Sequence, residues 1–170
     1  MAEDDPLLVD DEALLAQCRV ERFRVSGPGG QHRNKVESAV RITHLPTGVT
    51  TQAFESRSQH ENRARALERL RAAIALEVRR PVDLDGYEPS ERLRAILPGA
   101  RQQVRARNPA FWAGAAELLD VLVAERLALA ATAARLGLST GQLSRLITGE
   151  TALLAAVNRL RADAGLHPLR

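Results

Sequence analysis

The fold of this chain depends on one stretch, SGPGGQHRNKVESAVRITHLPTG, which runs from Ser26 to Gly48. Its first five residues, Ser26 to Gly30, contain three glycines and one proline. Neither helix nor strand tolerates that composition, so these residues predict a loop with an unusual backbone. Asn34 then offers a good N-cap and Glu37 stands three positions later, which favours a short helix after the loop.

The residues on either side of the loop predict a small sheet. Residues 18–25, CRVERFRV, interleave apolar and charged side chains, as a half-buried strand does. Residues 40–54 predict a hairpin around the turn residues Leu45 to Gly48. A helix is expected from Ser58 to about Arg79, because its apolar residues recur at helical spacing. The loop is therefore expected on a small sheet with a packed helix.

Composition divides the chain into four parts. Residues 1–17 form an acidic N-terminal segment, either a frayed tail or a short helix over residues 10–17. Residues 18–80 hold the loop, the sheet and the helix. Residues 81–109 contain four prolines and are expected to be a linker with a short helical stretch near residues 91–97. Residues 110–170 are rich in Ala and Leu and predict four helices. We expect an α+β domain followed by an all-α module.

The helical module contains a helix-turn-helix-like segment. Ala133, Gly137 and Leu143 have the spacing of that motif, with Gly137 in the turn. The side chains that would contact a nucleic acid are Gln142, Ser144 and Arg145. Packing within a small helical bundle is the alternative use of the same turn. Residues 128–148 are thus a candidate second contact for a nucleic acid or a protein.

Charge is concentrated in the predicted α+β domain. Residues 18–80 hold thirteen basic against six acidic residues, a net charge of +7, whereas residues 81–170 are only +2. A cationic block is typical of proteins that bind a phosphate backbone, although a solvated basic face is the alternative. Only three Phe, one Tyr and one Trp are present, which disfavours single-strand binding by aromatic stacking platforms.

The sequence also disfavours several classes of protein. No apolar run approaches the roughly 18 residues of a membrane span, and the N-terminus is acidic where a signal peptide is basic, so we expect a cytoplasmic protein without membrane contact. A single cysteine, Cys18, provides neither an internal disulfide nor a thiolate cluster. No His, Glu or Asp cluster has metal-ligand spacing, so no metal is expected.

The stretch from Ser26 to Gly48, followed by SRSQHENRARAL at Ser56 to Leu67, closely resembles the catalytic domain of class I peptide chain release factors. The resemblance covers roughly residues 18–78. It implies an α+β domain whose exposed loop enters the ribosomal peptidyl transferase centre and cleaves the ester that links peptide to tRNA. Its partners would be ribosomal RNA and peptidyl-tRNA, with water as co-substrate and no cofactor.

The resemblance implies that Gln31 is the catalytic residue, with its backbone amide stabilising the transition state and its side chain shaping the water pocket. Gly29 and Gly30 would let the backbone adopt positive φ and approach RNA closely. His32 as a general base is an alternative, but an RNA-contacting or helix-entry role is favoured. Methylation of Gln31 is compatible with the resemblance.

Other residues are expected to support the loop or to bind RNA. Loop geometry is assigned to Ser26, Gly27 and Pro28, with direct catalysis as the alternative for Gly27. The expected RNA-binding residues are Arg33, Lys35, Arg57, Arg63 and Arg65. Ser58 is expected to cap the following helix, and His44 and His60 are expected to be structural.

Full-length release factors carry a domain that reads stop codons and an N-terminal helical domain, and this sequence offers room for neither. Short rescue hydrolases usually end in a Lys/Arg-rich tail, which this sequence also lacks. We therefore expect hydrolysis of peptidyl-tRNA on stalled ribosomes without a stop codon. One alternative is a non-enzymatic RNA-binding module that retains the ribosome-docking surface. A weaker one is a helix-turn-helix DNA regulator.

Overall fold

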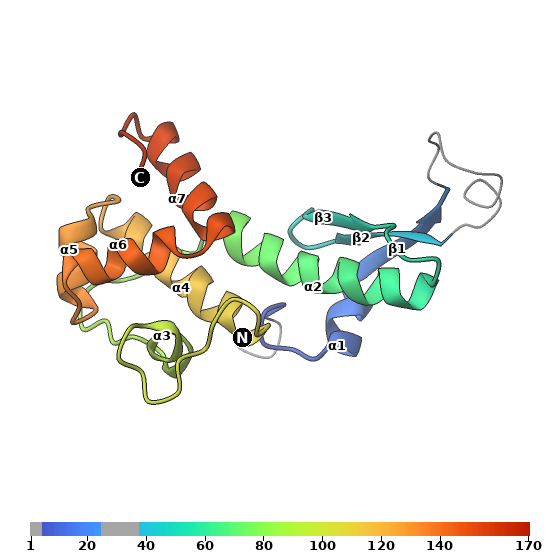
Figure 1. Cartoon of the computed structure of the whole chain (residues 1–170), viewed down its shortest axis with the longest axis horizontal. Helices are drawn as coiled ribbons and strands as arrows, with labels where there is room; N and C mark the ends of the chain where they lie inside the picture. The colour runs from blue at the N-terminus through green and yellow to red at the C-terminus, as the bar shows by residue number, and fades with distance from the viewer. Residues whose placement is uncertain (1–4, 25–37) are drawn as a thin grey trace. The chain divides into compact units, whose positions relative to one another are not determined.

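A computed structural model of the chain describes residues 5–24 and 38–170 (Figure 1). In these ranges it contains a three-stranded antiparallel sheet and seven helices, which confirms the expected α+β class. The chain divides into two units, Met1–Ile74 and Ala75–Arg170, and the boundary falls within helix α2. Each unit is described by itself below.

The first unit is built around the predicted sheet. Its elements are α1 (Asp11–Ala16), β1 (Cys18–Phe23), β2 (Ala39–His44), β3 (Thr50–Ala53) and most of α2 (Gln59–Glu77). The strands lie in the order β1-β2-β3, and the β2–β3 hairpin turns where the sequence predicted it. Cys18 stands opposite His44 and Phe23 opposite Ala39. The ends of β1 and β2 on either side of residues 24–38 are therefore paired.

One face of the sheet packs against α2. Val40 and Ile42 from β2 are fully buried, as are Ala66 and Leu70 from the helix. The Thr51 hydroxyl donates a hydrogen bond to the Ala66 carbonyl at 2.8 Å, which fixes β3 against the same helix. The alternation read from the sequence thus corresponds to an apolar face on α2 and an exposed outer face.

The acidic N-terminal segment is attached to α2 by Arg71. Its guanidinium donates to the Pro6 carbonyl at 2.8 Å, to the Val9 carbonyl at 2.9 Å and to the Asp11 carboxylate at 3.0 Å. Asp10 caps α1 by accepting from the Ala13 amide at 2.8 Å. Of the two alternatives for residues 10–17, the short helix is therefore the one observed.

The second unit is helical. It contains α3 (Glu91–Ile96), α4 (Ala110–Ala124), α5 (Leu129–Arg135), α6 (Thr140–Thr148) and α7 (Thr151–Asp163), so the four helices expected after residue 110 are confirmed. Helix α4 contacts α3, α5 and α7, and α6 contacts α5 and α7. Large side chains that are fully buried among these helices include Leu118, Leu119, Leu122, Leu143, Ile147 and Leu153. Gly137 has a φ of 67° in the turn between α5 and α6.

Residues 81–109, expected as a linker, contain α3 and pack on α4. The Glu117 carboxylate of α4 accepts from the Tyr87 hydroxyl at 2.6 Å and from the Ser90 amide at 2.9 Å. Burial, followed by the hydrogen bond to Glu117, raises the pKa of Tyr87. Gly114 of α4 faces α3 so closely that a Cβ there would lie 2.6 Å from the Arg92 carbonyl oxygen. The two helices therefore meet through a backbone-to-backbone approach.

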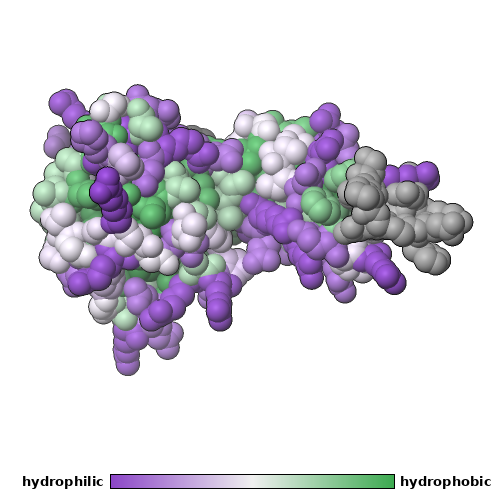
Figure 2. Space-filling model, turned by 45° about the horizontal axis from the view of Figure 1, so that its top comes forward, coloured by the Kyte–Doolittle hydropathy of each residue, from purple (hydrophilic) through white to green (hydrophobic). Residues whose placement is uncertain are grey.

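On the face drawn in Figure 2, hydrophilic side chains cover much of each unit. In the helical unit, hydrophobic side chains also reach the surface among the hydrophilic ones. No helix within the described ranges has the length and apolar character that a membrane span requires.

Replacing Gly114 by alanine is expected to destabilise the helical unit by about 1–3 kcal/mol, because the new methyl group would meet the Arg92 backbone. Gly141 in α6 is the matched control, since a Cβ there meets nothing within 4 Å. Gly141→Ala should be neutral or stabilising by up to about 1 kcal/mol. Urea denaturation of both variants measures the difference, and equal stabilities would contradict the close approach.

Candidate functional site

Most of the predicted site lies outside the residues that the structure describes. This holds for the catalytic and loop residues Ser26, Gly27, Pro28, Gly29, Gly30 and Gln31, and for the basic residues Arg33 and Lys35. The structure instead describes what flanks this stretch. These flanking residues are the paired strand ends Phe23 and Ala39 together with Ser38, Ser56 and Asn62. We call this group of residues the loop frame.

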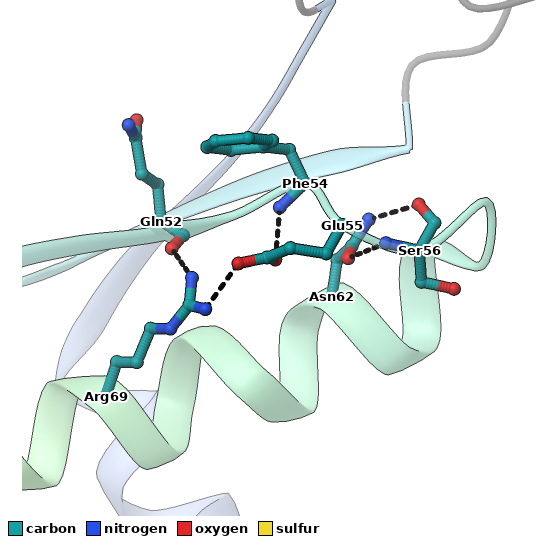
Figure 3. Close-up of polar contacts among 6 residues, drawn as sticks. All are labelled: Gln52, Phe54, Glu55, Ser56, Asn62 and Arg69. Carbon is teal, nitrogen blue, oxygen red and sulfur yellow. Dashed lines mark hydrogen bonds and ion pairs between the residues drawn. The ribbon is translucent and has the colours of Figure 1, made fainter.

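Asn62 is the central residue of the loop frame, and it is fully buried at the start of α2. Its side-chain nitrogen donates to the Ser38 carbonyl at 2.7 Å and to the Ser56 carbonyl at 2.8 Å. Its side-chain oxygen accepts from the Ser56 amide at 3.0 Å, as Figure 3 shows. One amide group therefore joins the residue before β2, the segment after β3 and the helix.

Arg69 binds both β3 and the segment that joins β3 to α2 (Figure 3). Its guanidinium donates to the Gln52 carbonyl at 2.7 Å and to the Glu55 carboxylate. The same carboxylate accepts from the Phe54 amide at 2.9 Å. The Arg69 hydrogen bond, with help from backbone amides, lowers the pKa of Glu55 to about 2. Glu55 is thus ionised and bonded at neutral pH, and it fixes the approach to Asn62.

The predicted RNA-binding residues within the described ranges are Arg57, Arg63 and Arg65, and all three are exposed. None of them forms an ion pair with any residue in ranges 5–24 and 38–170. By contrast, Arg69 and Arg71 on the same helix are bonded within the unit. The helix therefore leaves Arg63 and Arg65 exposed and uses Arg69 and Arg71 to hold the fold of its own unit.

The outer face of the sheet adds further cationic groups beside the loop frame. The Arg41 guanidinium lies over the Phe23 ring, 5.0 Å from its centroid, in a cation–π contact at the end of β1. Arg19 is exposed nearer the start of the strand and pairs with Glu21 at 3.6 Å.

His44 is buried and structural, as the sequence suggested. Its Nε2 lies 3.0 Å from the Gln17 side-chain oxygen, and its Nδ1 lies 2.7 Å from the Thr47 hydroxyl. Since Gln17 offers an oxygen, Nε2–H donates to it, and in the neutral imidazole the Thr47 hydroxyl donates to Nδ1. Burial lowers the pKa of His44. The ring joins the end of α1 to the β2–β3 turn.

Sequence reasoning missed Asn62, although it stands within the quoted motif SRSQHENRARAL. A signal was available, because a neutral amide among charged residues, one turn before a buried Ala66, falls on the apolar face of the helix. Ser58 caps α2 as expected, since its hydroxyl accepts from the Glu61 amide at 3.3 Å. Within the described part of the chain, no group of three or more His, Cys, Asp or Glu side chains could hold a metal ion.

The family model of the RF-1 domain matches residues 12–109, more than half of the chain. The chain belongs to the RF-1 domain family. The match takes in most of α1, the loop frame, α2 and α3, so it extends beyond the residues 18–78 that carry the resemblance in sequence, and it ends one residue before α4 begins.

Curated relatives agree with this family. The chain is 56% identical over 71 residues to peptide chain release factor 1 of Acidiphilium cryptum, which covers 42% of this chain and 20% of the relative. It is 52% identical over 66 residues to peptide chain release factor 2 of Paramagnetospirillum magneticum, covering 39% and 18%. With peptide chain release factor 1 of Rickettsia africae it shares 48% over 110 residues, covering 65% and 29%. The chain therefore spans less than a third of the length of these relatives.

In this RF-1 domain, Asn62→Asp is expected to destabilise the folded state by about 3 kcal/mol, because a carboxylate would face the carbonyl oxygens of Ser38 and Ser56. Asn108→Asp is the matched control. Asn108 is exposed and uses its side-chain oxygen to accept from the Ala110 amide at 3.0 Å, which an aspartate also does. Thermal unfolding of the two variants is the measurement. An equal loss of stability in both variants would contradict the role assigned to the Asn62 amide.

The RF-1 domain should also lose stability as pH falls, through His44. Its folded-state pKa lies below the ordinary 6.5, so between the two values the unfolded chain binds a proton that the folded chain does not. The contribution is complete above about pH 6.5 and declines as pH drops through the lowered value. Melting temperatures at about pH 7.5 and about pH 5.5 should differ less in His44→Gln than in the unmodified chain. His60→Gln, changed at an exposed position, should keep the full difference.

Proposed function

We propose that this chain hydrolyses the ester of peptidyl-tRNA on the ribosome. The observation that carries the proposal is membership of the RF-1 domain family together with an intact Gly29-Gly30-Gln31 triplet inside the matched residues. The relatives that share this region are named peptide chain release factors 1 and 2, and they support the same activity.

The proposed reaction is addition of water to the ester carbonyl carbon, followed by cleavage of the bond to the tRNA oxygen. The peptide leaves with a new carboxylate and the tRNA regains its hydroxyl. We assign stabilisation of the developing oxyanion to the Gln31 backbone amide, and placement of the water to its side chain. These roles need no titrating side chain in the loop, and no cofactor or metal is required.

The loop frame supports this proposal because a loop that works by position needs fixed ends. Asn62 bonds the carbonyl of Ser38, seven residues after Gln31, to the start of α2. Arg57, Arg63 and Arg65 are exposed and have no acidic partner in the described ranges, so we assign them, with Arg33 and Lys35, to phosphates of ribosomal RNA or tRNA. The proposed place of action is the cytoplasm, where ribosomes occur.

We further propose that the substrate is a stalled ribosome and that no stop codon is read. Support comes from residues 110–170, which lie outside the family match and form helices α4 to α7 of the helical unit. In this proposal catalysis belongs to residues 18–80, and the helical module provides a second contact, including residues 128–148, that helps the chain to recognise its target.

The test is release of labelled peptide from ribosomes stalled without a stop codon. Gln31→Ala is expected to reduce the release rate on the order of 10²-fold while leaving ribosome binding unchanged, because a misplaced water costs about that much. Gly30→Ala should behave in the same way. Release by both variants at the rate of the unmodified chain would contradict the assignment.

Two controls separate catalysis from binding in this assay. Gln102 is exposed, and Gln102→Ala should release peptide at the original rate. The double variant Arg63→Ala with Arg65→Ala should instead weaken ribosome binding, with a smaller dependence on salt, and retain release at saturating concentration. Binding of the unmodified chain without any release would favour the non-enzymatic RNA-binding module.

A further inference from the structure

The helical unit contains a cavity of about 660 Å³ that the proposed reaction does not use. It lies among the end of α3, residues 98–107, the start of α4 and helix α6 with the residues just after it. Its volume is in the range of sites that bind small molecules. The cavity belongs entirely to residues 75–170.

Part of the cavity wall is apolar. The half-buried apolar side chains that line it are Pro98, Val104, Ala106 and Leu146. Ile96 and Phe111 also line the cavity but are buried, so the half-buried side chains provide most of the apolar surface that a ligand can contact. Such a wall accepts a flat apolar group, because contact with it removes hydrocarbon from water.

The remainder of the lining is cationic. Arg105 and Arg107 come from the segment before α4, and Arg145 comes from α6. All three are exposed, and none forms an ion pair within the part of the chain that the structure describes. Glu150 is the acidic residue of the lining, and it caps α7 by accepting from the Ala152 amide at 3.4 Å. The cavity therefore offers three cations against one anion.

The helix-turn-helix-like segment contributes two of its three predicted contact residues to this lining, Gln142 and Arg145. The Gln142 side-chain oxygen is already engaged, since it accepts from the Ser139 amide at 2.9 Å in a capping box. Ser144 does not line the cavity. Helix α6 thus combines with residues 103–107 to form a concave site. This arrangement differs from that of a helix-turn-helix protein, in which one helix contacts the groove of a duplex.

We propose that this cavity binds a nucleotide of single-stranded RNA, with the base against the apolar wall and the adjoining phosphates on Arg105, Arg107 and Arg145. An unpaired nucleotide combines a flat, largely apolar base with anionic groups on both sides, which matches cations supplied by two separate segments. Guanidinium groups and aliphatic side chains replace the row of aromatic rings that this chain lacks. The choice of RNA over DNA rests on the proposed function.

The chain carries its own reporter for this site. Trp112 is the only tryptophan, and its ring lies 5.2 Å from the Phe111 ring in an edge-to-face contact. Occupation of the cavity should therefore change Trp112 fluorescence, whereas RNA held elsewhere on the chain should not. The experiment titrates the full chain with oligouridylate, a single strand without secondary structure, and follows this signal. It needs neither ribosomes nor an ester substrate, so absence of peptide release would leave its result unaffected.

The expected result is a saturable fluorescence change that weakens with salt. The double variant Arg105→Ala with Arg145→Ala should raise the Kd at least about tenfold and reduce the salt slope by about 1.4, since each phosphate contact to a single strand contributes about 0.7. Arg159 is exposed on α7 and does not line the cavity, so Arg159→Ala should leave the Kd unchanged. Ala106→Phe keeps every charge but fills the space, and it should also raise the Kd at least about tenfold, with folding checked by circular dichroism.

Several results would overturn the proposal. One is an unchanged Trp112 signal at saturating oligouridylate. Others are equal Kd values for the Arg105/Arg145 double variant and Arg159→Ala, or an unaltered Kd in a folded Ala106→Phe variant, which would reduce the site to general surface charge. Tighter binding of oligodeoxythymidylate or polyglutamate than of oligouridylate would replace RNA with DNA or with an acidic peptide.

Discussion

The first unit depends on the hydrogen bonds of one buried amide. Asn62 uses both hydrogens and its oxygen on backbone groups that come from different parts of the chain, at Ser38 and Ser56. A buried amide with every bond satisfied adds stability, and the same amide with a bond missing costs more than it gave. Its geometry is therefore strict, and it defines where β2 begins relative to α2. The Arg69–Glu55 pair supports this geometry, because it fixes the segment to which the Asn62 side chain is hydrogen-bonded.

Periodicity in the sequence predicted the elements of this fold well. Val40, Ile42 and His44 alternate and are all buried, and the Pro46-Thr47-Gly48 turn follows them. Local patterns could not predict which arginines remain free. Arg63 and Arg69 occupy the same helix, but the carbonyl of Gln52 and the carboxylate of Glu55 lie within reach of Arg69. That difference arises from tertiary structure, as does the cavity, which forms where residues 98–107 meet α6.

The proline-rich segment 81–109 is a second example of tertiary contacts that local sequence patterns could not predict. Four prolines and several turn formers indicated a linker, and the short α3 was expected within it. The close approach of α3 to α4 depends on Gly114 of α4, which has no Cβ. It also depends on Glu117 of α4, which accepts hydrogen bonds from Tyr87 and Ser90. The catalytic roles of Gly29, Gly30 and Gln31 stay predictions, because those residues lie outside the described ranges.

The contacts that hold the first unit together also have a consequence for how its sequence can change over evolution. Asn62 binds main-chain groups of Ser38 and Ser56, Arg69 binds the carbonyl of Gln52, and Arg71 binds those of Pro6 and Val9. Every residue type provides a backbone carbonyl, so each of these contacts restricts the identity of only one partner. The contact is lost when the donating side chain is replaced. The residue that provides the carbonyl can change to another type without loss of the contact. Covariation between partners would therefore fail to reveal these contacts, even though they hold the domain together.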